Sequence, residues 1–304
     1  MLKIFVSIIN FNGEKDTLNC LSSLNKVDSK DFELNVIVID NGSQMPLTLD
    51  KGLYDNFKLF FIKSAKNVGF SGGHNLGIKM ALSEGADYVV ILNNDVVLDK
   101  NVLQELLETF NKFNDCGIVS AKIYFAKGHE YHKVRYKDKD LGKVIWFAGG
   151  EINWADVLAF HKGVDEVDSG QFEKLEKSEF ASGCAMMVKR KVFEKVGFFD
   201  EKYFLYYEDN DFSQKAIKSG YGIYFQPKAI LWHINAGSAG GSGSSLQDYY
   251  ITRNRLIFGF KYANVRAKFA LLRESIKLLF KGRKWQRNGV RDFYLRNFGK
   301  GSFK

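Results

Sequence analysis

The chain has 304 residues, of which 45% are hydrophobic and 26% charged, a balance that fits a soluble globular protein with a sizeable core. Its net charge of +9 is uneven, because residues 253–304 hold 15 Lys and Arg against two acidic residues, a net of +13. The other residues therefore carry −4, and the basic C-terminal segment is interpreted separately.

Targeting signals and cysteines indicate the compartment. No apolar run approaches the ~20 residues that span a bilayer, and segment 1–12 turns polar too early for a secretory signal. Cys20, Cys116 and Cys184 are odd in number and lack metal-ligand spacing, which favours a reducing environment. We therefore expect a cytoplasmic protein.

The first hundred residues alternate between two patterns. Apolar runs predict strands, and helical patterns lie between them; the runs occupy 3–10, 33–40, 58–64 and 86–94. This order predicts an α/β fold with a mostly parallel sheet flanked by helices. Ligands of such sheets bind beyond the carboxyl ends of the strands, where Asp40, the glycine-rich loop 67–77 and Asn93–Asp95 fall. We expect the functional site at that edge.

The second half of the chain is less regular. Residues 117–125 predict a strand, and the polar stretch 127–143 predicts a surface loop. A helix is expected over 209–218, with carboxylates in its first turn, where the helix dipole favours them. The glycine- and serine-rich stretch 235–245 predicts a flexible segment.

Each motif at the sheet edge also has a purely structural interpretation. Asp40 fits an Asx-turn as well as a carboxylate that binds a nucleotide base or ribose. The glycine loop lacks the dinucleotide-binding spacing, so it fits a tight strand–helix turn or an approach to phosphate. Asp95 is one carboxylate, which suffices for a hard cation if substrate phosphates supply other ligands, and a strand-end turn is the alternative.

The acidic cluster and the last histidine are further candidates. Glu208, Asp209 and Asp211 follow the aromatic segment 204–207. Carboxylates in a partly apolar cleft have raised pKa values that suit a general base, and a capped helix start is the alternative. His233 ends a predicted strand and fits a structural role or a metal ligand.

Taken together, the motifs resemble the inverting family 2 glycosyltransferases, which use nucleotide sugars and have the GT-A fold, and in particular their bacterial rhamnosyltransferase-like branch. The resemblance covers roughly residues 4–258. The segments that carry it are VSIINFN (6–12), VIDNGS (38–43), NVGFSGGHNLGI (67–78), ILNNDVVLD (91–99), WFAGG (146–150), SGCAMMVKR (182–190), VGFFDEKYFLYYEDNDFSQKA (196–216), GYGIYFQPKAILWH (220–233) and YYITRNRL (249–256).

The resemblance implies a role for each matching residue. It implies that Asp209 is the catalytic base and that Asp95 and His233 bind a divalent cation, Mg²⁺ or Mn²⁺. Asn93 departs from the D-x-D triplet of the family, so its direct metal contact is open. The donor nucleotide would contact Asp40, Asn67, Gly69, Phe70, Gly72, Asn75 and Asn93. The sugar and acceptor pocket would be formed by Trp146, Ala148, Gly149, Gly150, Gly183, Cys184 and Glu208.

The same resemblance suggests substrates and domains. The branch favours L-rhamnose transfer from dTDP-rhamnose, although a UDP-hexose or UDP-galactofuranose would use nearly the same cleft. The acceptor is expected to be a saccharide linked to polyprenyl diphosphate, in bacterial cell-surface polysaccharide synthesis. We expect a GT-A domain over 1–258 and a basic amphipathic helical extension over 259–304.

The basic extension predicts a partner of its own. Phe269, Leu272, Ile276 and Leu279 recur on one face of a helix, with basic residues elsewhere around it. This pattern over 266–304 suits an anionic membrane surface, at ~1 kcal/mol per basic residue, which would place the protein peripherally at the inner face of the cell membrane. Packing on the catalytic domain is the alternative. Nucleic-acid binding leaves the acidic and glycine motifs unexplained, so no nucleic-acid partner is expected.

Overall fold

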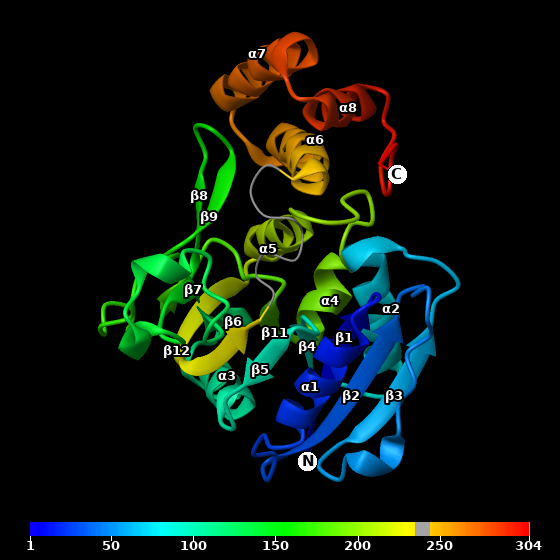
Figure 1. Ribbon diagram of the computed structural model, residues 1–304, viewed down its shortest axis with the longest axis vertical. Helices are drawn as coiled ribbons and strands as arrows, with labels where there is room; N and C mark the ends of the chain where they lie inside the picture. Colours follow the sequence, from blue (N-terminus) through cyan, green and yellow to red (C-terminus); the bar gives the residue numbers. More distant parts are fainter. Residues whose placement is uncertain (235–243, 304) are drawn as a thin grey trace.

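The computed structural model describes residues 1–234 and 244–303 and has an α/β fold around one large sheet (Figure 1). The strand order is β10-β12-β6-β11-β4-β1-β2-β3, with β5 paired to β12 and β7 paired to β6. The strands are β1 (Leu2–Asn10), β2 (Phe32–Asp40), β3 (Lys58–Lys63), β4 (Tyr88–Leu92), β5 (Val96–Leu98), β6 (Cys116–Phe125), β7 (Ile145–Phe147), β8 (Gly150–Asn153), β9 (Leu158–His161), β10 (Glu176–Lys177), β11 (Ala185–Lys189) and β12 (Gly222–His233).

Helices cover both faces of the sheet and extend beyond one end of it (Figure 1). They are α1 (Glu14–Leu24), α2 (Gly69–Ser83), α3 (Val102–Lys112), α4 (Arg190–Val196), α5 (Glu208–Lys218), α6 (Ser245–Tyr262), α7 (Val265–Lys281) and α8 (Lys284–Tyr294). The described residues also include the short 3₁₀ turns η1 (Lys51–Leu53), η2 (Lys133–Arg135) and η3 (Asp138–Asp140). The strands and helices expected in the first 125 residues are confirmed, and the polar stretch 127–143 forms the turns η2 and η3.

Most strands of the sheet run in one direction, as the sequence predicts, whereas β5, β7, β10 and β11 run antiparallel to their neighbours. Strands β4, β1, β2 and β3 are parallel neighbours, and β12 is parallel to β6. Strand β11 is antiparallel to both β4 and β6. It therefore joins two parallel groups into one curved sheet.

Alternate side chains of each strand face two apolar cores. Val6 of β1 packs into the core that includes Leu21 of α1, whereas Phe5 packs into the opposite core with Ile78 of α2. All four side chains are buried. Because both faces are covered, the strands are almost continuously apolar and end in polar residues only at the carboxyl edge.

The pairing of strands brings distant residues to that edge. Asn10 is opposite Asp40 where β1 and β2 end. Strand β12 pairs antiparallel with β5, so that His233 lies opposite Val96, directly after Asp95. The sheet thus joins the end of β12 to the segment that follows β4.

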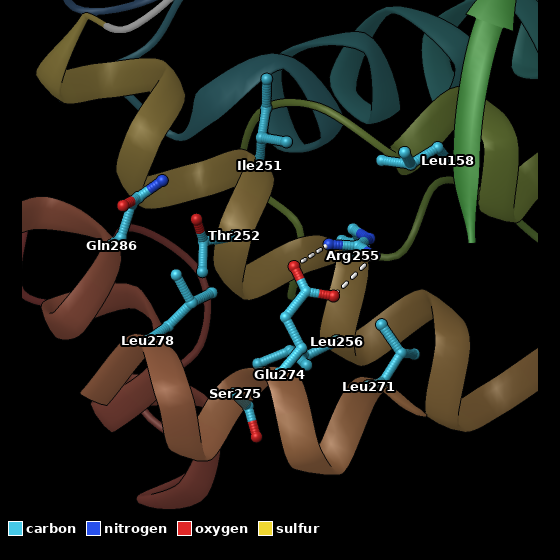
Figure 2. Close-up of a pocket in the computed structure, with 10 residues that line it drawn as sticks. All are labelled: Leu158, Ile251, Thr252, Arg255, Leu256, Leu271, Glu274, Ser275, Leu278 and Gln286. Carbon is cyan, nitrogen blue, oxygen red and sulfur yellow. Dashed lines mark hydrogen bonds and ion pairs between the residues drawn. The ribbon is translucent and has the colours of Figure 1, made fainter. Parts of the chain in front are cut away.

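The C-terminal helices pack together at one end of the molecule (Figure 1). The helix predicted from the spacing of Phe269, Leu272, Ile276 and Leu279 is confirmed as α7, although Leu272 and Leu279 are half-buried. A cavity of about 180 Å³ lies between α6, α7 and residue Leu158. Figure 2 shows the ion pair of Arg255 on α6 with Glu274 on α7 beside this cavity, with nitrogen–oxygen distances of 2.8 and 2.9 Å.

The predicted domain boundary lies within α6, and the predicted flexible stretch precedes this helix. The predicted domain boundary at residue 258 falls inside α6, and the division stays a prediction. The glycine- and serine-rich stretch lies mostly outside the described residues, which resume at Ser244. Among the described helices, none is long and apolar enough to cross a membrane.

Candidate functional site

Asp95 and His233 form a buried pair at the carboxyl edge of the sheet. Nε2 of His233 lies 3.0 Å from Oδ1 of Asp95, although the two residues are 138 positions apart. Burial acts to raise the pKa of Asp95, but hydrogen bonds from His233 and Asn93 outweigh it and hold the pKa below its usual value. Asp95 is therefore an anion poised at the edge.

The two asparagines before Asp95 have different surroundings. The side chain of Asn93 hydrogen-bonds Asp95, and its backbone N–H donates to the carbonyl of Cys184 at 2.9 Å. The amide of Asn94 donates to Thr17 Oγ1 at 2.9 Å and to the carbonyl of Gly13 at 3.3 Å. Asn93 thus orients the carboxylate, while Asn94 ties the segment to the start of α1.

A divalent cation fits this pair only together with substrate ligands. A carboxylate oxygen suits Mg²⁺ or Mn²⁺, and an imidazole nitrogen suits the transition metal Mn²⁺ better than Mg²⁺. The buried Nδ1 of His233 has no hydrogen-bond partner among residues 1–234 and 244–303. Within those same ranges, no three His, Cys, Asp or Glu side chains come together as a metal site. Asp95 and His233 would therefore hold the ion, and donor phosphates would complete its coordination.

The acidic residues Glu208 and Asp209 begin helix α5. Oδ2 of Asp209 accepts the backbone N–H of Gly183 at 3.0 Å, and Oδ1 accepts both the backbone and side-chain N–H of Asn210 at 2.8 Å. Burial raises the pKa of Asp209 despite these bonds. Burial, and then the charge of Asp209, raise the pKa of Glu208 well above its usual value. Asp209, which these hydrogen bonds fix and whose pKa is raised, therefore suits a general base.

Gly183 lets the glycine-rich loop 67–77, which is the expected donor loop, approach Asp209. A Cβ placed on Gly183 would lie 2.9 Å from Cζ of Phe70 and 3.6 Å from Cβ of Asp209. Phe70 follows the left-handed Gly69 at the start of α2 and packs edge-on against His74. The structure therefore places part of the expected donor loop and the expected base on either side of one glycine.

The donor loop is held from the other side by Asn41. Its amide donates to Oδ1 of Asn67 at 3.2 Å and to the carbonyl of Gly69 at 3.1 Å, while its oxygen accepts the N–H of Val68 at 3.1 Å. Sequence reasoning missed Asn41, although it follows Asp40 directly at the end of β2. This residue fixes the loop independently of the segments near Asp209.

Asp40 is buried and uses its carboxylate within the protein. It accepts hydrogen bonds from the hydroxyl of Ser43 and from the backbone N–H of Leu47. A hollow of about 220 Å³ lies beside it, lined by Asn10, Asn12, Glu14, Gln44 and Met45. Asp40 does not line this hollow, although it accepts a hydrogen bond at 3.4 Å from the lining residue Asn10, and a direct donor contact stays a prediction. The lining residues were not expected, since only their tertiary placement reveals them.

Two other expected donor residues also have structural partners. The amide of Asn75 is buried and exchanges hydrogen bonds with the backbone of Phe199 at 3.0 and 3.1 Å. A Cβ on Gly72 would lie 2.9 Å from the side chain of Val68. Both residues therefore make contacts within the protein, and their contact with a donor stays a prediction.

Trp146, a residue of the expected sugar pocket, packs against two histidines. Its ring packs edge-on against His233 at 4.8 Å and against His161 at 4.4 Å between centroids. Burial lowers the pKa of His161 to about 4, so this imidazole is neutral at physiological pH. Sequence reasoning missed His161, because it lies in the short hairpin strand β9.

Small residues of the expected pocket follow Trp146 closely in the sequence. Ala148, Gly149 and Gly150 connect β7 to β8, and a Cβ on Gly150 would collide with the ring of Phe180. Cys184 is buried, and burial raises the pKa of its thiol. The thiol is therefore neutral, and Cys184 acts near Asp95 as a small buried side chain.

The chain is similar to proteins of a known family. The model of the family described as Glycosyl transferase family 2 matches residues 5–197. The chain is 26% identical over 253 residues to the low-salt glycan biosynthesis hexosyltransferase Agl10 of Haloferax volcanii, covering 83% of this chain and 74% of that protein. It is 23% identical over 275 residues to the dTDP-rhamnosyl transferase RfbF of Shigella flexneri, covering 90% and 80%.

A third relative carries the name N-acetylglucosaminyl-diphospho-decaprenol L-rhamnosyltransferase. This Mycobacterium tuberculosis protein is 28% identical over 226 residues, which is 70% of each chain. The names of these relatives agree with the resemblance to the rhamnosyltransferase-like branch.

Solved structures share the fold at low sequence identity. GalNAc-T7 with UDP, GalNAc and Mn²⁺ superposes with a TM-score of 0.64 at 15% identity, covering 97% of this chain and 56% of that one. The mannosyltransferase PcManGT of Pyrobaculum calidifontis with GDP-Man and Mn²⁺ gives 0.54 at 13% identity, covering 99% and 76%. This chain has the GT-A fold, belongs to glycosyl transferase family 2 and is a glycosyltransferase.

Proposed function

We propose that this chain transfers a hexosyl unit from a nucleoside diphosphate sugar to a saccharide hydroxyl with inversion, with dTDP-L-rhamnose as the preferred donor. The observation that carries the proposal is the contact of Asp209 with Gly183, beside Phe70 of the donor loop. A base of raised pKa beside a nucleotide loop suits attack by a hydroxyl on the anomeric carbon. The choice of rhamnose rests on two relatives that are named as rhamnosyltransferases.

The residues divide the chemistry between them. Ionised Asp209 would accept the proton of the acceptor hydroxyl, whose oxygen attacks the anomeric carbon while the bond to the nucleoside diphosphate breaks on the opposite face. The N–H groups of Gly183 and Asn210 would hold Asp209 in line with that attack. A divalent cation held by Asp95 and His233 would neutralise charge on the departing diphosphate.

A donor panel tests this function. The chain is incubated with dTDP-rhamnose, UDP-galactofuranose and UDP-hexoses, with and without Mn²⁺, and release of nucleoside diphosphate is measured. We expect the largest metal-dependent release from dTDP-rhamnose. Preference for a UDP sugar would replace the donor while keeping the reaction class, and no release from any donor would contradict the function.

The outer face of α7 supports a lipid-linked acceptor at a membrane. Val265, Phe269, Ile276 and Phe280 are 69%, 67%, 48% and 80% exposed and share one side of the helix. The opposite side is buried against the other helices through Ala267, Leu271 and Ser275. Basic residues border the exposed stripe, namely Arg266, Arg273, Lys277 and Lys281. An apolar stripe with a cationic border suits an anionic bilayer, on which the lipid-linked acceptor would be presented.

Sedimentation with vesicles tests the membrane proposal. The intact chain should sediment with phosphatidylglycerol vesicles and less with phosphatidylcholine vesicles. The double variant Phe269→Asp with Phe280→Asp should lose this binding, whereas Val134→Asp, at a fully exposed residue of η2, should keep it. Point variants are preferable to deletion of 266–304, because that segment also packs against α6. Equal sedimentation of both variants, or none by the wild type, would refute the proposal.

A further inference from the structure

The turn before helix α5 has an unusual backbone. Phe204, Tyr206 and Tyr207 have φ values of 63°, 68° and 70°, in the left-handed region. None of them is glycine, so each carries a steric cost between its Cβ and its own backbone. Since Glu208 and Asp209 follow at once, surrounding contacts must hold this turn if the carboxylates are to keep one position.

Helix α6 supplies those contacts through two adjacent, fully buried side chains, Arg253 and Asn254. The amide of Asn254 donates at 2.8 Å to three backbone carbonyls of the turn, those of Tyr203, Leu205 and Tyr206. Nη2 of Arg253 donates to the carbonyls of Lys202 at 3.2 Å and Tyr203 at 3.1 Å. Both side chains therefore bind main-chain atoms of the turn and secure its path.

The two side chains are themselves oriented. Nε of Arg253 donates to Oδ1 of Asn254 at 3.0 Å, which directs the amide N–H groups of Asn254 toward the turn. Nη1 of Arg253 donates to the hydroxyl of Tyr249 at 3.3 Å, and that hydroxyl donates to Asp292 of α8 at 2.5 Å. The C-terminal helices thus support the pair from behind.

The turn also contacts the donor loop. The carbonyl of Phe204 accepts the backbone N–H of Phe70 at 2.7 Å. Its position leaves no room for a Cβ on Gly69. One turn therefore connects the start of α2, where the donor is expected, to the start of α5, which carries Asp209.

We propose that Arg253 and Asn254 are positioning residues for glycosyl transfer, which hold the left-handed turn 203–207 so that Asp209 stays aligned with the donor loop. Neither side chain reaches the site itself, so both act through the main chain of the turn. The proposal rests on the proposed role of Asp209 as the base.

The variant Asn254→Asp tests it with little change in size. The carboxylate replaces the N–H donors by oxygen atoms that face three carbonyls, so the turn loses its support. We expect kcat to fall on the order of 100-fold, because misplacement of a base by about 1 Å costs that much. The dissociation constant of dTDP, measured by calorimetry, should change much less than kcat, since Asn41 holds the donor loop through three hydrogen bonds in addition to the one that the turn makes with Phe70.

A matched control uses another asparagine of the C-terminal helices. The side chain of Asn264 caps α7 by accepting the N–H of Ala267 at 2.9 Å. Asn264→Ala should lower Tm but keep the wild-type kcat, which separates general destabilisation from loss of alignment. If Asn254→Asp does not fold, Arg253→Lys tests the same contacts, because an ammonium group keeps the charge but cannot bind the carbonyls of the turn, Asn254 and Tyr249 at once, as the three nitrogens of the guanidinium do.

The outcomes separate this proposal from the proposed function. Loss of kcat with dTDP affinity retained, in Asn254→Asp or Arg253→Lys, supports it, and wild-type kcat in the folded variant overturns it. Equal loss of kcat in Asn264→Ala would also overturn it, because the effect would then be one of stability alone. If the wild type releases nucleoside diphosphate but Asp209→Asn does so equally well, the base assignment fails, and the proposal fails with it.

Discussion

The substitution Asp209→Asn tests the base assignment with little change in shape. Oδ1 accepts two N–H groups of Asn210, and Oδ2 accepts one from Gly183. The new amide will keep its oxygen toward Asn210 and turn its NH₂ toward the N–H of Gly183, where two donors face each other. Leaving the buried N–H of Gly183 without an acceptor costs about 1–3 kcal/mol, so we expect the variant to stay folded.

The expected effect on turnover is much larger. A positioned base contributes roughly 10²–10⁴-fold, so kcat should fall by that factor, which corresponds to ~3–5 kcal/mol of activation free energy. The affinity for dTDP should be unchanged, because the contacts of Asn41 with the donor loop do not involve Asp209. Glu84→Gln, at an exposed carboxylate just after α2, is the control and should behave as the wild type.

The pH profile provides an independent assay. Asp209 must be ionised to accept a proton, so kcat of the wild type should rise with pH through the pKa of this carboxyl group. Burial raises that pKa above 3.8, so the midpoint of the acidic limb should lie above 3.8. The residual rate of Asp209→Asn should lack this limb. Wild-type turnover in the variant, or the same acidic limb in both proteins, would refute the reasoning.

Three further predictions concern neighbouring groups. Asp95→Ala should weaken dTDP binding in the presence of Mn²⁺ by at least about 10-fold, and calorimetry showing an unchanged metal dependence would remove Asp95 from the site. Glu208→Gln should flatten the pH dependence of Tm: burial raises the pKa of Glu208, so its stabilising contribution is complete below the unfolded-state pKa and lost as pH rises through the folded-state pKa. An equal fall in Tm with pH in both proteins would contradict this. Gly183→Ala should destabilise the protein by about 1–3 kcal/mol in denaturant unfolding, because its methyl group would press on Phe70, and an unchanged midpoint would contradict the close packing.

Much of the fold was predictable because its signals are local. Buried parallel strands are continuously apolar, and the runs ending at Asn10, Asp40 and Leu92 each give way to a polar residue or a polar segment. The carboxyl edge and its candidate residues follow from that pattern. The meeting of Asp95 with His233 does not, because it depends on the pairing of β12 with β5. That contact was expected only through the family resemblance.

Other features could not be predicted, since they depend on backbone geometry that side-chain types conceal. The aromatic run 203–207 favours extended structure by composition, yet three of its residues are left-handed. Asp40 lies at the expected strand end, but whether its carboxylate meets a ligand or Ser43 is decided by the path of the following loop. Asn41 appeared to be an ordinary turn residue and instead fixes the donor loop.

The C-terminal helices combine two features that a division at residue 258 would separate. The buried side of α6 binds the turn 203–207, which precedes the helix that carries Asp209. The exposed side of α7 presents the apolar stripe. Since Lys261 of α6 also pairs with the buried Asp211 of α5 at 2.6 Å, removal of residues 259–304 would take away a charge partner inside the catalytic half. The basic extension thus contacts α5, the helix that carries Asp209, through an ion pair.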